Sequence, residues 1–213
     1  HRFLTAHGSP NYGHSGICAM QRAFAFMYTL GDYPRPDYGQ SDLIIYWERQ
    51  PIYSGPVARP AQAFLAAKQR GAKIIAIKPS VEPDVGMADI WVPVRPGTDA
   101  ALALAMLHVV IGEDLIDHVF VEKWCHGFKR LQAHVRQYDP QWAESISGVP
   151  AGQIEAVAKL YAMTPRATID LGNGVEHAPS ANDAIRAVAI LMAITGHLDR
   201  PGANIFALPP KAA

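Results

Sequence analysis

Three short apolar runs constrain the fold of this chain more than any other feature of its sequence. They are residues 42–47 (DLIIYW), residues 72–79 (AKIIAIKP) and residues 167–174 (ATIDLGNG). Each run is apolar and β-branched, is bounded by turn residues, and does not alternate polar with apolar positions. Such runs are typical of parallel strands that are covered on both faces. The chain is therefore predicted to form an open, mostly parallel sheet.

Helical patterns lie between these strands. Four segments combine apolar spacing with a start or stop residue: residues 56–71, 98–114, 150–163 and 180–196. A weaker strand is predicted over residues 89–94, where Pro93 favours a sheet edge. Residues from about 113 to 148 predict short inserted helices. This order of elements predicts an α/β fold of Rossmann-like, three-layer type, with helices on both faces of the sheet.

Composition limits the classes of partner. The 19 Lys and Arg residues balance 19 Asp and Glu residues, so no net field favours nucleic acid or an anionic membrane. The longest apolar run, residues 100–111, is interrupted by His108 and is too short to span a bilayer. We therefore expect neither a nucleic-acid partner nor direct membrane insertion. Two cysteines, Cys18 and Cys125, do not make a disulfide framework.

The beginning of the chain differs from the rest. Residues 28–42 (YTLGDYPRPDYGQSD) are rich in Tyr, Pro and Gly and predict a tethered loop rather than a helix or strand. We therefore expect an irregular lead-in over residues 1–41, made of a loop and a helix that begins near Cys18, and a single α/β domain over residues 42–213. His1 as the first residue, with no signal-peptide pattern after it, suggests a domain cut from a longer protein.

Ligands of open α/β sheets bind outside the carboxyl ends of the strands, so the loops that follow the strands are candidate sites. In residues 95–99 (RPGTD), Gly97 permits close backbone approach and Thr98 is a predicted N-cap. Asp99 stands in the first turn of the helix, and Arg95 adds a positive charge. Together with the free N–H groups of the helix start, these residues suit a phosphate or pyrophosphate. An ordinary capped loop would have the same residues.

Two further loops carry polar groups. Gly172 and Gly174 of the GNGVEH loop have no side chain that would keep a ligand from the backbone, while Asn173 and Glu176 offer hydrogen-bonding groups to a heterocyclic base. A plain strand-to-helix turn with glycines at positive φ is the alternative. After the first strand, Arg49 could bind phosphate and Gln50 a ring, or both could simply be solvated. The sequence has no G-x-G-x-x-G, P-loop or G-x-S-x-G motif and no Cys/His pair at zinc spacing.

These loops, taken in order, resemble those of the molybdopterin oxidoreductase family, which includes formate dehydrogenases and nitrate, dimethyl-sulfoxide, polysulfide and arsenate reductases. The resemblance is carried by DLIIYWERQP, RGAKIIAIKP, ADIWVPVRPGTDAALALAMLHVVI, FVEKWCHGF, LGNGVEHAPSANDAIRAVAILMAITGHLDRPGAN and GSPNYGHSGIC. It implies a molybdenum or tungsten ion held by paired pterin guanine dinucleotides. The chain resembles one of two homologous α/β domains that each bind one dinucleotide. The implied partners are other domains of the same polypeptide and an iron–sulfur electron-transfer subunit.

The resemblance also implies a role for Cys18. In this family the protein ligand to the metal is a Cys, selenocysteine, Ser or Asp that stands just before a helix at the entrance to this domain. Cys18 stands at that position, and GSPNYGHSGIC is similar to the version in the polysulfide, thiosulfate and arsenate reductase branch. A thiolate is a soft ligand that suits a metal already held by sulfur. His14 could line the substrate funnel and shuttle protons, or be a solvated loop histidine.

The chain departs from the family pattern at two loops. Trp47 to Pro51 match the family's W-G-R-N-P loop, but Glu48 replaces the glycine. Lys78, Pro79 and Ser80 stand where the family favours Asp-Pro-Arg, so a lysine replaces the acid and could meet a phosphate instead. The predicted cofactor-binding residues are Trp47, Glu48, Arg49, Gln50, Lys78, Pro79, Ser80, Arg95, Gly97, Thr98, Asp99, Gly172, Asn173, Gly174 and Glu176.

Two functions from different classes follow. The first is a fragment of a molybdenum or tungsten oxidoreductase that binds one dinucleotide and supplies Cys18 to the metal, inactive and without cofactor when isolated. The second is a non-catalytic module, descended from that family, that binds a nucleotide or a protein; Glu48, Lys78 and Ser80 favour it. An unrelated hydrolase is disfavoured because no nucleophile elbow is present.

Overall fold

The computed structural model describes residues 2–9, 18–53 and 59–206. Its centre is a parallel sheet with strand order β4-β3-β2-β5. The strands are β2 (Leu43–Trp47), β3 (Lys73–Ile77), β4 (Ile90–Val92) and β5 (Ala167–Leu171). The three predicted buried runs are thus strands, and the run with Pro93 is the predicted edge strand. The expected α/β fold class is confirmed.

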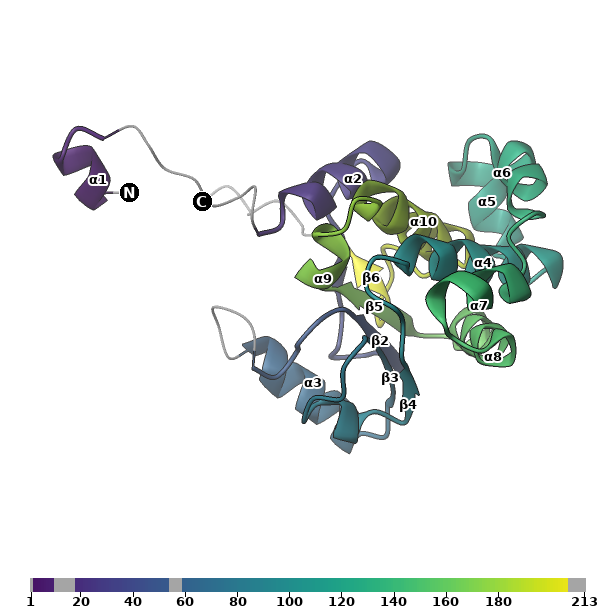
Figure 1. Cartoon of the computed structure of the whole chain (residues 1–213), viewed down its shortest axis with the longest axis horizontal. Helices are drawn as coiled ribbons and strands as arrows, with labels where there is room; N and C mark the ends of the chain where they lie inside the picture. The colour runs from purple at the N-terminus through teal and green to yellow at the C-terminus, as the bar shows by residue number, and fades with distance from the viewer. Residues whose placement is uncertain (1, 10–17, 54–58, 207–213) are drawn as a thin grey trace.

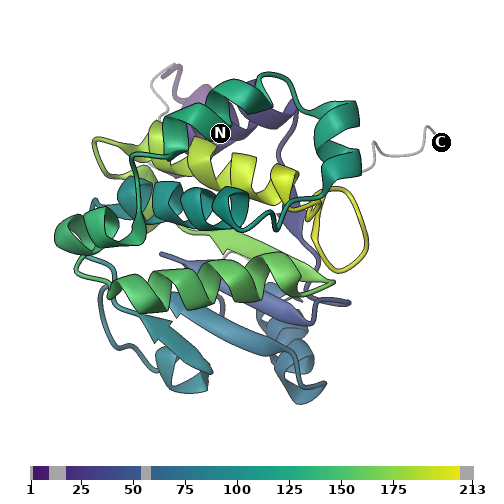
Figure 2. The ribbon, with the colours of Figure 1, turned by 90° about the vertical axis from the view of Figure 1, so that its right-hand side faces the viewer.

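Helices cover both faces of the sheet (Figures 1 and 2). On one face α3 (Arg59–Gln69) packs Phe64 and Ala67 against Ile44 and Tyr46 of β2. On the other face lie α4 (Asp99–Gly112), α8 (Ala151–Met163) and α10 (Ala181–Ile194). Alternate residues of β2 therefore enter two different apolar layers, which explains why this run shows no polar alternation.

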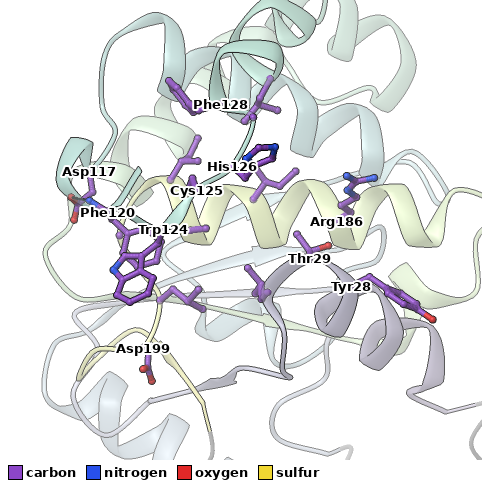
Figure 3. Close-up of a pocket in the computed structure, with 18 of the residues that line it drawn as sticks. Tyr28, Thr29, Asp117, Phe120, Trp124, Cys125, His126, Phe128, Arg186 and Asp199 are labelled. Atoms are coloured by element: carbon purple, nitrogen blue, oxygen red, sulfur yellow. Dashed lines mark hydrogen bonds between the residues drawn. The ribbon is translucent and has the colours of Figure 1, made fainter. Parts of the chain in front are cut away.

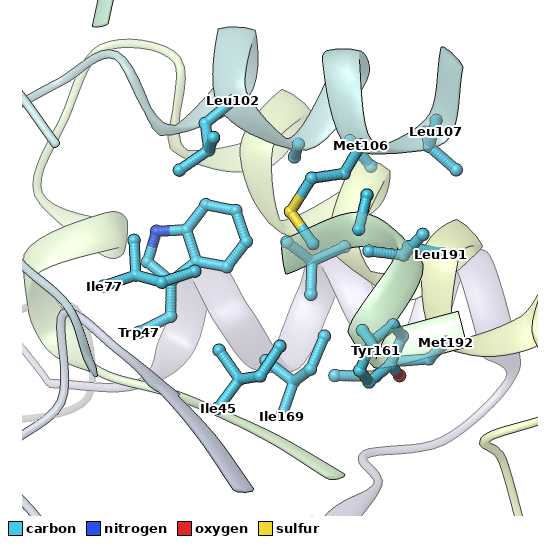
Figure 4. Packing of buried hydrophobic residues seen from close by; sticks show 14 of the residues in the cluster. Ile45, Trp47, Ile77, Leu102, Met106, Leu107, Tyr161, Ile169, Leu191 and Met192 are labelled. Carbon is cyan, nitrogen blue, oxygen red and sulfur yellow. The ribbon is translucent and has the colours of Figure 1, made fainter. Parts of the chain in front are cut away.

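The larger layer forms the main core (Figure 4). Trp47 and Ile45 from β2 meet Met106 of α4 and Leu191 of α10 there, all of them buried. Helix α4 is covered by the sheet and by neighbouring helices, so its apolar residues are buried nearly all round. The core therefore fixes where the first turn of α4 meets the ends of the strands.

The predicted short helices are α5 (His118–Trp124), α6 (Phe128–Val135) and α7 (Pro140–Ser147). The Asp117 side chain accepts a hydrogen bond from the N–H of Phe120, and Asp139 accepts one from Trp142. These are N-caps, which compensate the unpaired N–H groups at helix starts. Pro140 at the start of α7 is also favourable because that position needs no N–H donor.

In its described residues the lead-in forms two helices and a two-residue strand. It contains α1 (Arg2–Ala6) and α2 (Met20–Leu30), which ends at Gly31 with φ 87°. The expected loop over residues 28–42 is therefore wrong at its beginning, where the last turn of α2 takes three residues. It is also wrong at β1 (Arg35–Pro36), which pairs antiparallel with β6 (Asn204–Ile205). A two-residue strand has no local pattern, and its partner is distant in sequence.

The ends of two further elements differ from expectation. The third run ends as a strand at Leu171, and Asn173 begins a short helix, α9 (Asn173–Glu176). The strand predicted over residues 89–94 is shorter, because β4 spans only Ile90–Val92, and a 3-10 turn, η2 (Val85–Met87), precedes it. Within the described part of the chain, no helix is long and apolar enough to cross a membrane.

Candidate functional site

The carboxyl ends of the strands lie side by side, with Trp47 opposite both Ile77 and Leu171. We call the residues that follow these ends the rim: residues 47–50, 78–84, 95–99 and 172–176. The N–H of Gly172 donates to the carbonyl of Trp47 at 2.8 Å. A Cβ on Gly172 would lie 1.8 Å from the carbonyl oxygen of Glu48. Only glycine permits this backbone approach, which joins two loops of the rim.

Glu48 lies at the centre of the rim in an unusual conformation. Its φ is 50°, in the left-handed region that glycine adopts freely and that costs other residues roughly 1–2 kcal/mol. The glycine of the resembling W-G-R-N-P loop would adopt it without this cost. The Glu48 side chain lies over Gly174, where an added Cβ would be 2.3 Å from Oε2. Glu48 thus has a strained backbone conformation, and the absence of a side chain at Gly174 leaves space for its carboxyl.

The carboxyl of Glu48 is half-buried and has acidic neighbours. Burial raises its pKa from the ordinary 4.5 to about 7, and the charge of Asp99 acts in the same direction. Lys78 lowers the pKa by a smaller amount, and Glu82 raises it further. Among the described residues, Glu48 has no side-chain hydrogen bond or ion pair. Its ionised form is therefore poorly compensated in the chain by itself.

Replacing Glu48 with Gln is expected to stabilise the fold above about pH 7 and to change it little below about pH 4. Between these values the folded state keeps a proton that the unfolded state has released, so wild-type stability falls as the pH rises. The Glu48→Gln variant has no carboxyl to titrate here, so its stability does not fall in this way. Urea unfolding of both chains across the pH range measures the difference, with exposed Glu122→Gln as control. A difference that does not change with pH would contradict the raised pKa.

Lys78, Gln50 and Ser80 lie together around two acids, Glu82 and Asp84. The buried Lys78 ammonium lies 2.9 Å from Glu82 Oε2 and 3.3 Å from Asp84 Oδ2. Gln50 donates to Asp84 at 3.0 Å, and Ser80 donates to Glu82 at 3.1 Å. Lys78 therefore neutralises protein carboxylates and is not a free cation for a phosphate. Glu82 was not identified from the sequence, although its spacing of four residues from Lys78 is a weak signal.

Other predicted residues are held by protein partners. Arg49 donates through Nε to Asp170 Oδ2 at 3.1 Å, and Tyr38 donates to the same oxygen. Trp47 is fully buried and donates through Nε1 to Asp99 Oδ1 at 2.7 Å. Burial raises the pKa of Asp99, and the Trp47 hydrogen bond opposes this. Trp47 and Asp99 therefore join β2 to the start of α4.

In the RPGTD loop, residues 95–97 are exposed at the rim, Thr98 is half-buried and Asp99 is buried. Thr98 is the residue before α4, as predicted, but its hydroxyl donates to the carbonyl of Arg95 instead of capping the helix. Arg95 donates to the carbonyl of Ile146 at 2.6 Å. Ser180 donates to the carbonyl of Gly97 at 3.4 Å, which links this loop to the segment after β5. Pro79 is exposed at the same edge, and Asn173 is partly exposed.

Cys18 lies in the turn before α2 and is partly buried, outside the apolar core. One turn further on, Arg22 makes an ion pair with Glu176 of α9, with Nη2 and Oε1 3.0 Å apart. The N–H of Arg22 also donates to Glu176 Oε2 at 3.3 Å. These contacts hold the start of α2 beside the rim (Figure 1). The sequence did not indicate Arg22, and His14 lies outside the described residues.

A large cavity lies elsewhere, between the end of α2, α5, α6 and α10 (Figure 3). Its volume is about 1230 Å³, and Trp124, Cys125, His126, Phe128 and Arg186 are among its lining residues. None of the predicted site residues that the structure describes lines it. We therefore take the rim, which collects the polar groups, as the candidate site.

Comparison with known proteins identifies the family. Residues 5–209 match the family model described as molybdopterin oxidoreductase. Acetylene hydratase from Syntrophotalea acetylenica is 34% identical over 98% of this chain, and thiosulfate reductase subunit PhsA from Salmonella typhimurium is 31% identical over 93%. The solved structure of acetylene hydratase from Pelobacter acetylenicus superposes with a TM-score of 0.84, at 34% identity, over 98% of this chain.

The match covers only part of each relative. The chain spans 28% of the length of either acetylene hydratase and 26% of the thiosulfate reductase subunit. The names of these relatives include a hydratase and a reductase, so similarity identifies the family and not the reaction. The family that the loops resembled is thereby confirmed. This chain belongs to the molybdopterin oxidoreductase family.

Proposed function

We propose that this chain is the part of a molybdenum or tungsten oxidoreductase that holds one pterin guanine dinucleotide and supplies Cys18 to the metal. One observation supports this above all. The turn that carries Cys18 is tied by Arg22 and Glu176 to the loop after β5, where the strand ends converge. A thiol at this position is near the rim and outside the core.

The residues of the rim fit such a ligand. Gly172 and Gly174 leave the backbone bare beside Glu48, so a bulky flat group can approach closely. The Thr98 hydroxyl donates to the carbonyl of Arg95 and does not cap α4, so it does not compete with an anionic group at the start of this helix. Glu48 offers a carboxyl that has no hydrogen-bond partner among the described residues. The rim thus has donors for phosphate and an acceptor for a heterocycle.

The part played by the chain is positional. When bound, the metal and its dinucleotides supply the two-electron redox chemistry. The rim loops bind and orient one dinucleotide, and Arg22 with Glu176 sets the place of the Cys18 sulfur. A soft thiolate donor suits a metal that is already held by sulfur. On this proposal the 213-residue chain by itself shows no turnover with artificial electron donors. Robust turnover would contradict the positional role.

The two cysteines provide a matched test of the metal ligand. Cys18→Ser and Cys125→Ser are made in the protein expressed with its flanking coding sequence. X-ray absorption at the metal edge is expected to show one sulfur neighbour fewer in Cys18→Ser and no change in Cys125→Ser. Cys125 follows α5, and burial raises the pKa of its thiol, which disfavours the thiolate. An unchanged sulfur count in Cys18→Ser would contradict the proposal. A protein without metal that still bound a nucleotide would favour the non-catalytic module.

A further inference from the structure

We propose that Glu48 determines ligand specificity at the rim by accepting hydrogen bonds from a 2-amino-4-oxopyrimidine edge, which guanine and pterin share. This inference rests on the proposed function, because it needs the rim to hold a pterin guanine dinucleotide. It concerns a residue at which the chain departs from the pattern that it otherwise resembles.

The backbone gives the first reason. A non-glycine residue at φ 50° persists only where its surroundings determine the conformation, and such residues cluster at ligand sites. Here the N–H of Glu48 donates to the carbonyl of Ile77 at 2.7 Å, and Gly172 packs on the Glu48 carbonyl. The side chain consequently lies over Gly174. A glutamate is thus held, at a cost, where a glycine would be relaxed.

The second reason is that the carboxyl has no hydrogen-bond or ion-pair partner within the part of the chain that the structure describes. The neighbouring donors are already used, since Trp47 donates to Asp99, Arg49 donates to Asp170, and Lys78 is paired with Glu82 and Asp84. The charged groups that act on Glu48 are Asp99, Glu82 and Lys78, of which two are acidic. A half-buried carboxylate in these surroundings gains from any ligand that brings N–H donors.

The acidic neighbours also restrict the chemistry of the ligand. A phosphate placed against Glu48 would be repelled, so the carboxyl suits a neutral ring with donors. Guanine and pterin each present a ring N–H beside an amino group, which match the two oxygens of one carboxylate. Hypoxanthine lacks the amino group, and the corresponding edge of adenine has a ring acceptor in place of the N–H. A divalent cation is a poorer fit, because no group of three or more His, Cys, Asp or Glu among the described residues could hold a metal.

Four soluble probes test this assignment on the 213-residue chain. The probes are GDP, IDP, ADP and neopterin, and ligand-observed NMR measures the weak affinities expected of one half of a site. GDP is expected to bind about tenfold more tightly than IDP, which is the effect of one hydrogen bond to a charged group. In Glu48→Gln this preference is expected to fall to about twofold or less, because the amide no longer offers two charged acceptors. Exposed Glu122→Gln, on α5, is the control and keeps the wild-type preference.

The pH dependence gives an independent readout. The ratio of GDP to IDP affinity is expected to rise as the pH is raised through about 7, because the ionised carboxyl is the better acceptor. The ratio removes the titration of the phosphates, which both nucleotides share. In Glu48→Gln the ratio is expected to stay constant across the same range. A pH-dependent ratio that survives in this variant would overturn the role of Glu48.

The outcomes distinguish guanine from pterin as the group bound by Glu48, and they distinguish this inference from the proposed function. Dependence on Glu48 seen for GDP alone identifies the guanine end of the dinucleotide, and dependence seen for neopterin alone identifies the pterin end. Binding of GDP or neopterin that is unaffected by Glu48→Gln overturns this inference and leaves the proposed function intact. Binding of neither probe, by the chain or by the protein with its flanking sequence, overturns both.

Discussion

Replacing Trp47 with Ala is expected to lower the free energy of unfolding by about 3–5 kcal/mol. Trp47 is fully buried at the end of β2, in contact with the core that α4 and α10 complete (Figure 4). Its removal leaves a cavity and takes the indole donor from Asp99. Chemical denaturation of the two chains measures the effect.

Two companion variants separate packing from hydrogen bonding. Trp47→Phe keeps most of the ring but removes the donor, so it is expected to cost about 1–3 kcal/mol, the penalty of an unsatisfied buried acceptor. Trp124→Ala is the matched control, because Trp124 is 68% exposed and contacts Lys123 at its ring. It is expected to cost less than about 1 kcal/mol. If Trp47→Ala cost no more than this control, the role given to the core beneath the rim would be wrong.

The central sheet could be predicted because its signals are local. Each strand is a run of apolar, β-branched residues with turn residues at both ends, and burial on both faces removes the need for alternation. The order of elements then places the following loops at one edge of the sheet. For the same reason the positions of the RPGTD loop and the GNG loop at this edge follow from the sequence, whereas the position of Cys18 was implied only by the family resemblance.

Contacts between distant residues could not be predicted in this way. The β1–β6 pair covers the outer side of β5, where the Asn204 side chain accepts from the N–H of Ile169 and donates to its carbonyl. The side-chain amide of Asn204 thus makes the two hydrogen bonds that a neighbouring strand would make with Ile169. No sequence pattern around Asn204 predicts these bonds. The partner of Arg49, Asp170, is likewise distant in sequence, whereas Lys78 pairs with Glu82 and Asp84 of its own loop. Sequence therefore identified the loops of the rim, but not which of their charges are already neutralised.

Replacing Arg22 with Ala is expected to cost about 3–5 kcal/mol of unfolding free energy, because it leaves the Glu176 carboxylate buried without its cation. The side chain of Glu176 is 0% exposed and that of Arg22 is 9% exposed. Burial raises the pKa of Glu176, and Arg22 is the main group that lowers it again. The loss is therefore expected to be largest near neutral pH and to shrink as acid protonates Glu176.

An exposed pair of the same type is the control. Arg166 contacts Asp42 at 2.6 Å, but the two side chains are 50% and 43% exposed, so Arg166→Ala is expected to cost less than about 1 kcal/mol. The apolar double variant Arg22→Met with Glu176→Leu is expected to recover most of the stability, because no buried charge remains. Equal costs for Arg22→Ala and Arg166→Ala would show that Glu176 is solvated in solution.

The reactivity of Cys18 tests separately whether the Arg22–Glu176 pair fixes the geometry at the start of α2, which a stability measurement does not show. If the Arg22–Glu176 pair holds the start of α2 at the rim, the apolar double variant should be stable and yet have a looser first turn. Alkylation of Cys18 by iodoacetamide is then expected to be faster in the double variant than in the wild type, with Cys125 as the internal reference. An unchanged rate would mean that packing on α10 alone sets the place of the sulfur. A buried ion pair of this kind adds little net stability, so its effect lies in fixing one geometry for the residue that we propose as the metal ligand.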